Sequence, residues 1–157
     1  MPYFQYMKSI FIILFTVAGI TAKSQTAEDS VKAVVNNLFT AMKNADTVLL
    51  KSTFADAAIF QTISKEKETN KTIIVTDAVE GFVQSIGKST PGDADERITF
   101  GSVKVDGDLA SVWTPYNFYW KGKFSHCGAN SFQLVKLNGA WKIQYLIDTR
   151  RRQGCTP

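Results

Sequence analysis

The stretch SFQLVKLNGAWKIQYLIDTR, residues 131–150, decides the fold of this chain. Two runs rich in β-branched and aromatic residues flank Asn138-Gly139, a dipeptide that favours a two-residue turn between antiparallel strands. Such a turn places Leu137 opposite Ala140, and this pair fixes every other facing pair in the hairpin. The sequence therefore predicts a long β-hairpin in a single register.

This register gives the hairpin one apolar and one polar face. The apolar face, which we expect to point inward, holds His126, Asn130, Phe132, Leu134, Trp141, Ile143, Tyr145, Ile147 and Thr149. The polar face holds Cys127, Ser131, Gln133, Lys142, Gln144, Asp148 and Arg150, and we expect it to meet solvent or a partner.

Two more turn signals, Asp106-Gly107 and Lys121-Gly122, lie upstream of the hairpin. They predict an antiparallel meander of four strands, at about 96–105, 109–120, 124–137 and 141–151. A two-residue turn at Lys121-Gly122 places Asn117 opposite His126, so that Trp113, Pro115, Asn117 and Tyr119 join the inward face. A three-residue turn would shift the pairing by one residue and invert this strand.

Helical periodicity marks the first half of the chain. Apolar residues at helical spacing follow a capping box of Thr26 and Asp29, which predicts a helix at about 27–44. Asp46 begins a second, short helix, and Asp77 with Glu80 begins another, which ends near Gly87. Between them we expect strands at 57–64 and 72–76, joined by a charged, solvated loop.

These elements predict an α+β fold in which helices cover one face of a strongly bent antiparallel sheet. The N-terminal helices, the strand ending IFQT and the C-terminal hairpin with its Gly-x-Trp-x-Ile pattern resemble the nuclear transport factor 2-like (NTF2-like) superfamily over about residues 27–151. The chain is similar in particular to secreted bacterial members of the SnoaL-like and lumazine-binding type. The resemblance implies a cone, a cystatin-like α+β roll, with a pocket at its wide end and often a dimer.

Residues 1–24 have the features of a secretory signal peptide. Lys8 precedes an apolar run from Ile10 to Ile20, which is too short to span a bilayer, and small residues flank Lys23. We expect cleavage after Ser24, a single domain of residues 25–157 with no membrane anchor, and a periplasmic or secreted location. Cys127 and Cys155 can then form a disulfide, although two independent thiols would also fit the sequence.

Composition excludes several classes of protein. The chain has 157 residues, 12% of them aromatic, with 10 Gly and 4 Pro, which excludes a disordered or collagen-like chain. The formal net charge of +4 falls to +2 without Lys8 and Lys23, so we expect no nucleic-acid partner. His126 is the only histidine, so we expect no metal site, and nothing in the sequence indicates a cofactor.

His126 is the best candidate for an acid or base, because an unperturbed histidine titrates near neutral pH. We predict that it lines the pocket with the ligand contacts Trp113, Asn117, Tyr119 and Asn130. Two members of the fold, scytalone dehydratase and ketosteroid isomerase, work with His or Asp in the cone, but neither full residue set is present here. Asp148 falls on the polar face and could assist His126 only if a β-bulge intervened. Arg151 is a candidate anion contact, or simply part of an exposed cationic strand end.

We therefore expect an exported protein that binds a small apolar or aromatic molecule. The alternative is a proton-transfer enzyme of the dehydratase, isomerase or hydrolase kind that uses His126 with Asp148. A protein-interaction domain is a third possibility if side chains fill the cone. In the same register Tyr116, Phe118 and Trp120 face outward, which predicts a homodimer through the outer face of the sheet.

Overall fold

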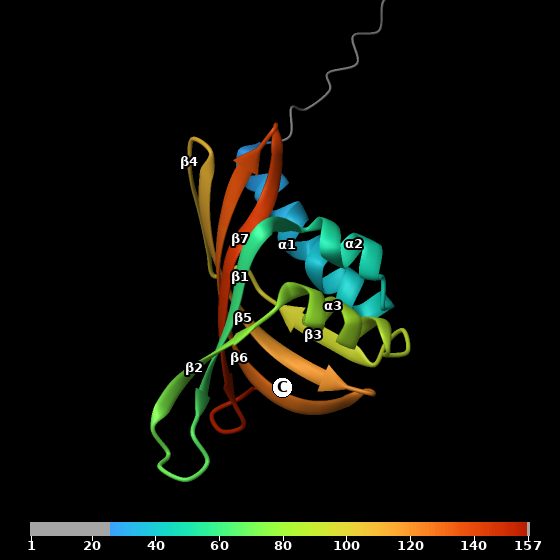
Figure 1. The fold of residues 1–157 in the computed structure, drawn as a ribbon, viewed down its shortest axis with the longest axis vertical. Coiled ribbons are helices and arrows are strands. Elements are labelled where there is room, and N and C mark those ends of the chain that lie inside the picture. The colour runs from blue at the N-terminus through green and yellow to red at the C-terminus, as the bar shows by residue number, and fades with distance from the viewer. Residues whose placement is uncertain (1–25, 157) are drawn as a thin grey trace, which may run out of the picture.

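The structure is a computed structural model that describes residues 26–156. The predicted signal peptide, residues 1–24, lies outside the described residues. Within them, no helix combines the length and the apolar character that a membrane span requires. Helices cover one face of a bent sheet, so the predicted α+β class is confirmed (Figure 1).

Three helices begin where the sequence predicts them. α1 (Ala27–Asn44) has the predicted capping box, in which Thr26 Oγ1 accepts a hydrogen bond from the Asp29 amide. α2 (Thr47–Ser52) begins at Asp46, whose carboxylate accepts a hydrogen bond from the Leu49 amide. α3 (Val79–Gly87) has no side-chain cap of this kind. These caps satisfy backbone amides at the first turns of α1 and α2, where the sequence predicts the two helices to begin.

The sheet has seven strands. Their bounds are β1 (Phe54–Lys65), β2 (Thr72–Asp77), β3 (Ala94–Ile98), β4 (Ser102–Asp106), β5 (Leu109–Trp120), β6 (Lys123–Leu137) and β7 (Ala140–Arg151). The order across the sheet is β2-β1-β7-β6-β5-β3, with β4 also pairing with β5. The β1–β7 pair is parallel and the others are antiparallel, so the sheet is mixed and not wholly antiparallel as predicted.

The single strand predicted at 96–105 is instead two strands, β3 and β4, which pair with successive parts of β5. The break lies opposite Pro115, whose ring nitrogen cannot donate a ladder hydrogen bond. Gly101 lies in the gap and packs closely on Trp113, with 3.0 Å between an added Cβ and the Trp113 ring. Ile98 of β3 pairs with Tyr116 and Ser102 of β4 pairs with Trp113, so the two strands differ by one residue in their register against β5.

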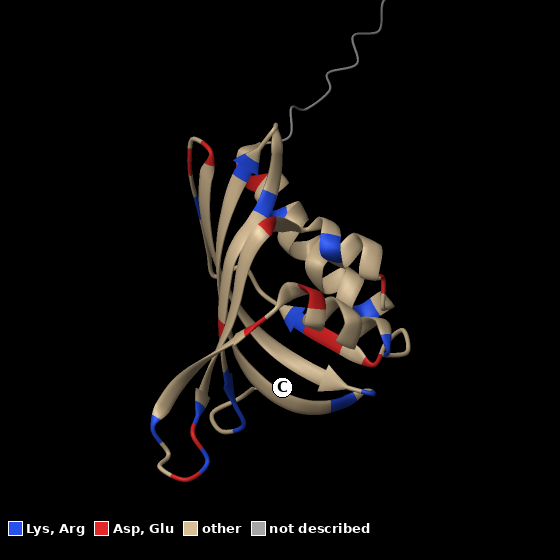
Figure 2. Cartoon of the chain, in the orientation of Figure 1, with Lys and Arg blue, Asp and Glu red and all other residues tan. Residues whose placement is uncertain are grey.

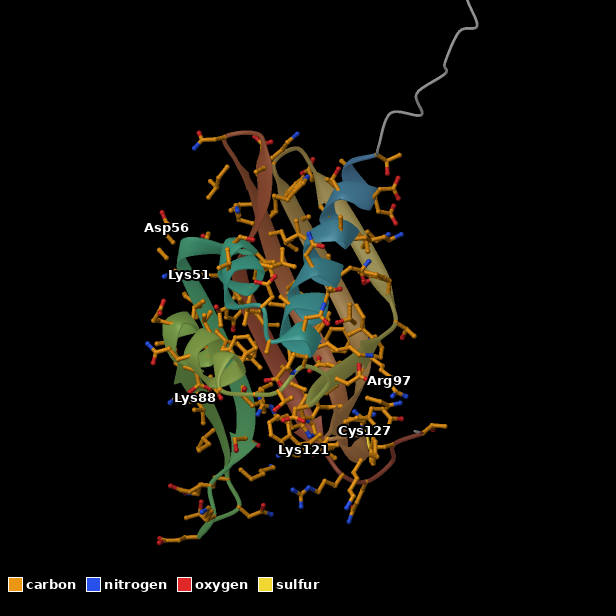
Figure 3. The ribbon with its side chains drawn as sticks, turned by 90° about the vertical axis from the view of Figure 1, so that its right-hand side faces the viewer. Lys51, Asp56, Lys88, Arg97, Lys121 and Cys127 are labelled. Carbon is orange, nitrogen blue, oxygen red and sulfur yellow. A yellow bond between two sulfur atoms is a disulfide. The ribbon has the colours of Figure 1, made fainter. Side chains whose placement is uncertain are left out.

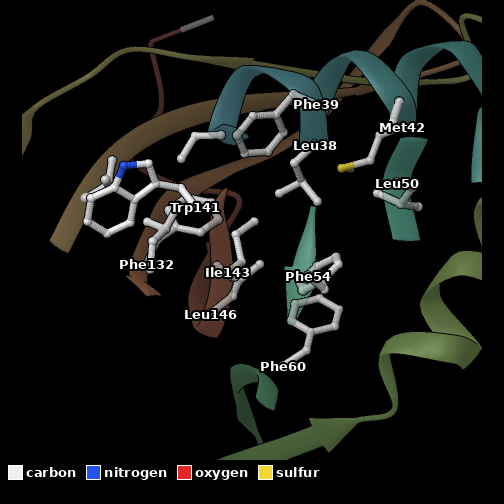
Figure 4. Packing of buried hydrophobic residues seen from close by; sticks show 14 of the residues in the cluster. Leu38, Phe39, Met42, Leu50, Phe54, Phe60, Phe132, Trp141, Ile143 and Leu146 are labelled. Carbon is white, nitrogen blue, oxygen red and sulfur yellow. The ribbon is translucent and has the colours of Figure 1, made fainter. Parts of the chain in front are cut away.

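The core fills the space between α1 and the concave face of the sheet (Figure 4). Leu38 and Phe39 of α1 pack with Phe132 of β6, and the two aromatic rings meet edge to face at 6.2 Å. Trp141 and Ile143 of β7 are buried in the same cluster. The core cluster thus runs from α1 across the concave face to Val83 and Ile86 of α3.

Two β-bulges correct the predicted register, and both hairpin turns remain as predicted. At the β5–β6 turn Trp120 pairs with Lys123, but beyond the bulge Phe118 pairs with His126. At the β6–β7 turn Leu137 pairs with Ala140, but beyond the bulge Asn130 pairs with Asp148. Each bulge adds one residue to one strand and so reverses which side chains of the paired strand segments share a face.

The reversal moves several residues from the face that the sequence predicts. Tyr116 and Phe118 of β5, and Leu146, Asp148 and Arg150 of β7, share the concave face with His126 and Asn130. Trp113, Pro115, Asn117, Tyr119, Tyr145, Ile147 and Thr149 lie on the outer face, so their predicted inward placement is wrong. Strong bending requires bulges, and the sequence shows no local signal at the extra residues, Ser125 and Gln144.

A disulfide between Cys127 and Cys155 holds the C-terminal tail on the outer face of the sheet. Asn117 Nδ2 donates a hydrogen bond to the Thr156 carbonyl oxygen at 2.8 Å, beside the disulfide. Figure 3 shows Cys127 at the end of the sheet where the last strand finishes. The tail therefore turns back just after Arg150, Arg151 and Arg152, of which the first two end β7.

Candidate functional site

A cavity of about 460 Å³ lies between α3 and the concave face of the sheet, at the end that α1 leaves uncovered. Apolar side chains form most of its wall: Met42, Phe60, Phe82, Ile86, Phe118 and Trp120. Its polar side chains come mainly from the bent strands: Asp77, Ser85, Ser89, Glu96, Tyr116, His126, Asp148 and Arg150. A cavity of this size, with polar groups set among apolar side chains, is typical of a small-molecule site.

Asp148 is the best-buried charged residue of the cavity, with 5% of its surface exposed. Its Oδ2 accepts hydrogen bonds from Arg150 Nε at 2.8 Å and, more weakly, from the Tyr116 hydroxyl at 3.4 Å. Arg150 also donates to Thr62 Oγ1 on the neighbouring strand β1. The other oxygen, Oδ1, is buried and receives no hydrogen bond from the described part of the chain. A bound molecule could donate to it only if the Asp148 side chain turned this oxygen toward the cavity, because the atom has almost no accessible surface.

Tyr116 reaches across β6 because Gly128 has no side chain. A Cβ at Gly128 would lie 2.7 Å from the Tyr116 hydroxyl and 1.8 Å from the Thr149 carbonyl oxygen. The Tyr116 hydroxyl donates a hydrogen bond to that carbonyl oxygen at 2.8 Å. Burial, with the nearby carboxylates Glu96 and Asp148, raises the pKa of Tyr116, so the hydroxyl is a permanent hydrogen-bond donor.

Glu96 of β3 is a carboxyl group that the sequence analysis did not select. Burial raises the pKa of Glu96 to about 7. The negative charge of Asp148 also contributes to this rise, whereas the hydrogen bond from Asn130 lowers the pKa. Asn130 Nδ2 donates to Glu96 Oε1 at 2.8 Å and is also within 3.3 Å of Thr114 Oγ1. A carboxyl group with a pKa near 7 can both give and take a proton at neutral pH.

His126 faces the cavity beside Phe118 and Tyr116, with ring centroids 5.0 Å and 5.8 Å from its own. Its Nδ1 lies 3.0 Å from the Ser125 hydroxyl. Burial and the positive charge of Arg150 lower the pKa of His126, and Asp148 only partly opposes them. The imidazole is therefore mostly neutral at pH 7, which suits a base or a hydrogen-bonding partner.

The structure brings together only some of the predicted site residues. His126 and Asp148 both line the cavity, because the β6–β7 bulge turns Asp148 inward. Asn130 is buried behind Glu96 and holds it in place. Trp113, Asn117 and Tyr119 lie on the outer face, so their prediction as pocket residues is wrong, and the outward prediction for Tyr116, Phe118 and Trp120 is wrong for the same reason.

Arg151 is exposed near the end of β7 and pairs with Cys127 on the outer face, so both predictions for it, an anion contact and an exposed cationic strand end, stay open. It lines a separate hollow of about 380 Å³ with Ser125, His126, Arg150 and Arg152. Figure 2 shows the positive charge at this end of β7 and in the loop that follows. His126 and Arg150 line both hollows, so the basic surface adjoins the cavity.

The groove beside α2 is larger, at about 800 Å³, but chemically poorer. Its charged groups include the exposed ion pair of Lys51 with Glu80. Within residues 26–156, no cluster of three or more His, Cys, Asp and Glu side chains can hold a metal ion. The cavity between α3 and the sheet is therefore the candidate site.

In comparisons by sequence, no protein-family model and no curated protein matches the chain. Solved structures do match. An NTF2-like protein of unknown function from Shewanella baltica covers 79% of this chain and 93% of its own, with a TM-score of 0.61 and 15% identity. A cystatin-like domain of unknown function from Nostoc punctiforme covers 83% of this chain and 82% of its own, with a TM-score of 0.62 and 17% identity.

A third similar structure is an NTF2-like family protein from Streptomyces avermitilis, which is provisionally named a dehydratase. It is 14% identical, with a TM-score of 0.57, and covers 79% of this chain and 95% of its own. At such low identity the likeness is one of fold. The arrangement of the helices and the bent sheet is therefore that of the NTF2-like, cystatin-like fold.

Proposed function

We propose that this protein binds a small, largely apolar or aromatic molecule in the cavity between α3 and the sheet. The observation that carries the proposal is the buried Asp148 Oδ1, which has no hydrogen-bond partner among the described residues and belongs to a side chain that lines the cavity. An unpartnered buried acceptor costs about 1–3 kcal/mol, and a ligand hydroxyl or N–H group would recover this once the Asp148 side chain turned Oδ1 toward it. The apolar wall would hold the rest of the molecule.

The basic hollow beside the cavity supports a ligand with a negatively charged group. Arg151 and Arg152 form no ion pair within residues 26–156, whereas Arg150 is already paired with Asp148. A carboxylate or sulfonate that leaves the cavity past His126 would meet these guanidinium groups. An aromatic anion therefore fits both regions.

Gly81 of α3 offers a direct test, because it lines the cavity and a Cβ added there meets nothing within 4 Å. Gly81→Phe should fill the cavity without disturbing the helix. The matched control, Gly81→Ala, removes the glycine but leaves the space. The probe is 8-anilinonaphthalene-1-sulfonate, an aromatic anion whose fluorescence rises in apolar sites.

We expect the wild type and Gly81→Ala to bind one probe molecule in a saturable manner, and Gly81→Phe to lose at least about tenfold in affinity, or ~1.4 kcal/mol. Circular dichroism would check that all three proteins are folded. Equal probe affinity in the wild type and Gly81→Phe, or no saturable binding to the wild type, would contradict the proposal.

A proton-transfer enzyme is the second candidate, and a specific observation favours it. Glu96, with its pKa raised to about 7, and the mostly neutral His126 line the same cavity as Asp148. Groups that titrate near neutral pH on opposite sides of a substrate can remove a proton from one atom and deliver one to another. Dehydration and isomerisation both need this pair of steps.

Isotope exchange separates a binder from an enzyme. Compounds that raise the melting temperature would be incubated with the protein in deuterated buffer and analysed by mass spectrometry. A proton-transfer enzyme should introduce deuterium at carbon, and Glu96→Gln or His126→Gln should slow this exchange by about 100-fold or more. Binding without any deuterium uptake would reject the enzyme and leave the binding function intact.

We also propose that the protein acts in the periplasm or outside the cell. The predicted signal peptide and the Cys127–Cys155 disulfide both support an oxidising compartment. The intact mass of the protein recovered from a periplasmic extract should correspond to cleavage after Ser24, with both cysteines resistant to alkylation before reduction. Full-length protein in the cytoplasmic fraction alone would contradict this.

A further inference from the structure

β2 is an exposed strand at the end of the sheet. One edge pairs with β1, and among the described residues no strand pairs with the other edge. In Figure 1 the β1–β2 hairpin projects past the body of the molecule at the lower left, so nothing described covers this edge. Every residue of β2 is exposed, including the apolar residues Ile73 (39%), Ile74 (59%) and Val75 (39%).

Free edges of this kind are usually protected. Proteins place Lys, Pro, bulges or inward charges on edge strands so that they do not pair with other chains. Residues 72–76 of β2 are Thr-Ile-Ile-Val-Thr and contain none of these devices. An unprotected apolar edge on a folded chain indicates a surface that pairs with another strand.

The sequence of β2 is matched to a second copy of itself. In an antiparallel pair with Ile74 on the two-fold axis, each Ile73 lies opposite Val75 of the partner subunit. Thr72 likewise lies opposite a threonine, the partner's Thr76. β-branched residues thus face β-branched residues along the whole strand.

Charge is complementary at both ends of this pair. The same register places Lys71 opposite Asp77 of the partner subunit, and the symmetry repeats this contact at the other end. Neither Lys71 nor Asp77 forms an ion pair within residues 26–156. Asp77 ends β2 and Lys71 directly precedes it, so the two charges flank an otherwise uncharged strand. A parallel pair would instead bring like charges together.

We infer that β2 joins two copies of this chain edge to edge, with antiparallel pairing centred on Ile74, so that the two sheets become continuous. This interface differs from the outer sheet face predicted from Tyr116, Phe118 and Trp120, since those side chains line the cavity. The inferred dimer interface is therefore separate from the cavity, and Asp77 is the one residue of β2 that lines the cavity.

Analytical ultracentrifugation of the mature protein tests this inference. Ile74→Lys places two lysines side by side on the axis and should yield monomers. The control is Ile59→Lys, on the outer face of β1, where an isoleucine of similar exposure (47%) is replaced. This control should remain dimeric. A monomeric wild type would overturn the inference, as would a dimer that Ile59→Lys dissociates and Ile74→Lys does not.

A charge swap tests the register itself. Lys71→Asp sets a second carboxylate against the partner's Asp77 and should raise the dissociation constant at least about tenfold. The double variant Lys71→Asp with Asp77→Lys restores opposite charges and should recover dimer affinity to within a few-fold of the wild type. Failure of the second change to rescue the first would overturn this register, even if Ile74→Lys were monomeric.

Discussion

At the scale of single residues, Gly128 and Glu96 matter most to the site. Gly128 lets Tyr116 cross β6, and Glu96 carries the carboxyl group with the raised pKa. Neither was selected from the sequence. The sequence gives no local sign of either role: Gly128 is not part of a turn motif, and Glu96 is one of several charged residues on a strand. Both roles arise from packing against elements that are distant in the sequence.

Gly128→Ala should be strongly destabilising. The added methyl group would overlap the Thr149 carbonyl oxygen, at 1.8 Å, which is backbone and cannot move without breaking the β6–β7 ladder. We expect a loss of about 3 kcal/mol or more in the free energy of unfolding, measured in urea. Gly81→Ala, where there is open space, should be neutral or slightly stabilising. A similar small effect at both glycines would contradict the packing of Tyr116 over Gly128.

Glu96 should make the protein less stable as the pH rises from about 4.5 to 7. Its folded-state pKa is raised to about 7 from 4.5, so the folded state holds this proton more tightly than the unfolded state over that range. The lowered pKa of His126 acts in the opposite direction, since it penalises the folded state below about pH 6.5 and this penalty fades as the pH rises toward 6.5.

Glu96→Gln isolates the contribution of Glu96. Relative to the wild type, the variant should gain about 2–3 kcal/mol of stability between pH 5 and pH 8, because the wild type alone must ionise a buried carboxyl group. Urea unfolding at the two pH values, with His126→Gln measured in parallel, checks this. A pH-independent difference between wild type and Glu96→Gln would contradict the burial of Glu96.

At the scale of elements, local sequence signals predict the helices and turns better than they predict the roles of single residues. The capping box fixes α1 at Ala27–Asn44, and Lys121-Gly122 and Asn138-Gly139 form the predicted two-residue turns with positive φ. The errors begin where the sheet bends. The bulges at Ser125 and Gln144 accompany the curvature of the whole sheet. A register that is extended from the two turns without these bulges therefore places Asn117, Tyr119 and Asp148 on the wrong face of the sheet.

The C-terminal tail is an element whose contribution can be measured. The Cys127–Cys155 disulfide closes a 28-residue separation and holds the tail on the outer face. Replacing both cysteines with alanine should lower the free energy of unfolding by about 3 kcal/mol. Wild-type protein in reductant should lose a similar amount, while the double variant should be insensitive to reductant. Equal stability of the oxidised and reduced wild type would contradict a stabilising role.

At the scale of the whole molecule, the α+β class follows from the pattern of elements, and the resemblance to the NTF2-like superfamily implied a cone with a pocket at its wide end. Neither predicted which side chains form the cavity wall. The β6–β7 bulge brings Asp148 into the cavity with His126, and the β5–β6 bulge brings in Tyr116 and Phe118. Ligand binding and proton transfer, as proposed, depend on both bulges, because the unbulged register would turn Asp148 and Tyr116 to the outer face.

Cross-strand backbone NOEs in a ¹⁵N,¹³C-labelled sample test this claim most directly. We predict NOEs that pair Phe118 with His126 and Asn130 with Asp148, as in the bulged register. NOEs that instead pair Asn117 with His126 and Asn130 with Ile147 would show an unbroken register. That result would contradict the cavity, the proposed function and the role of Asp148 together.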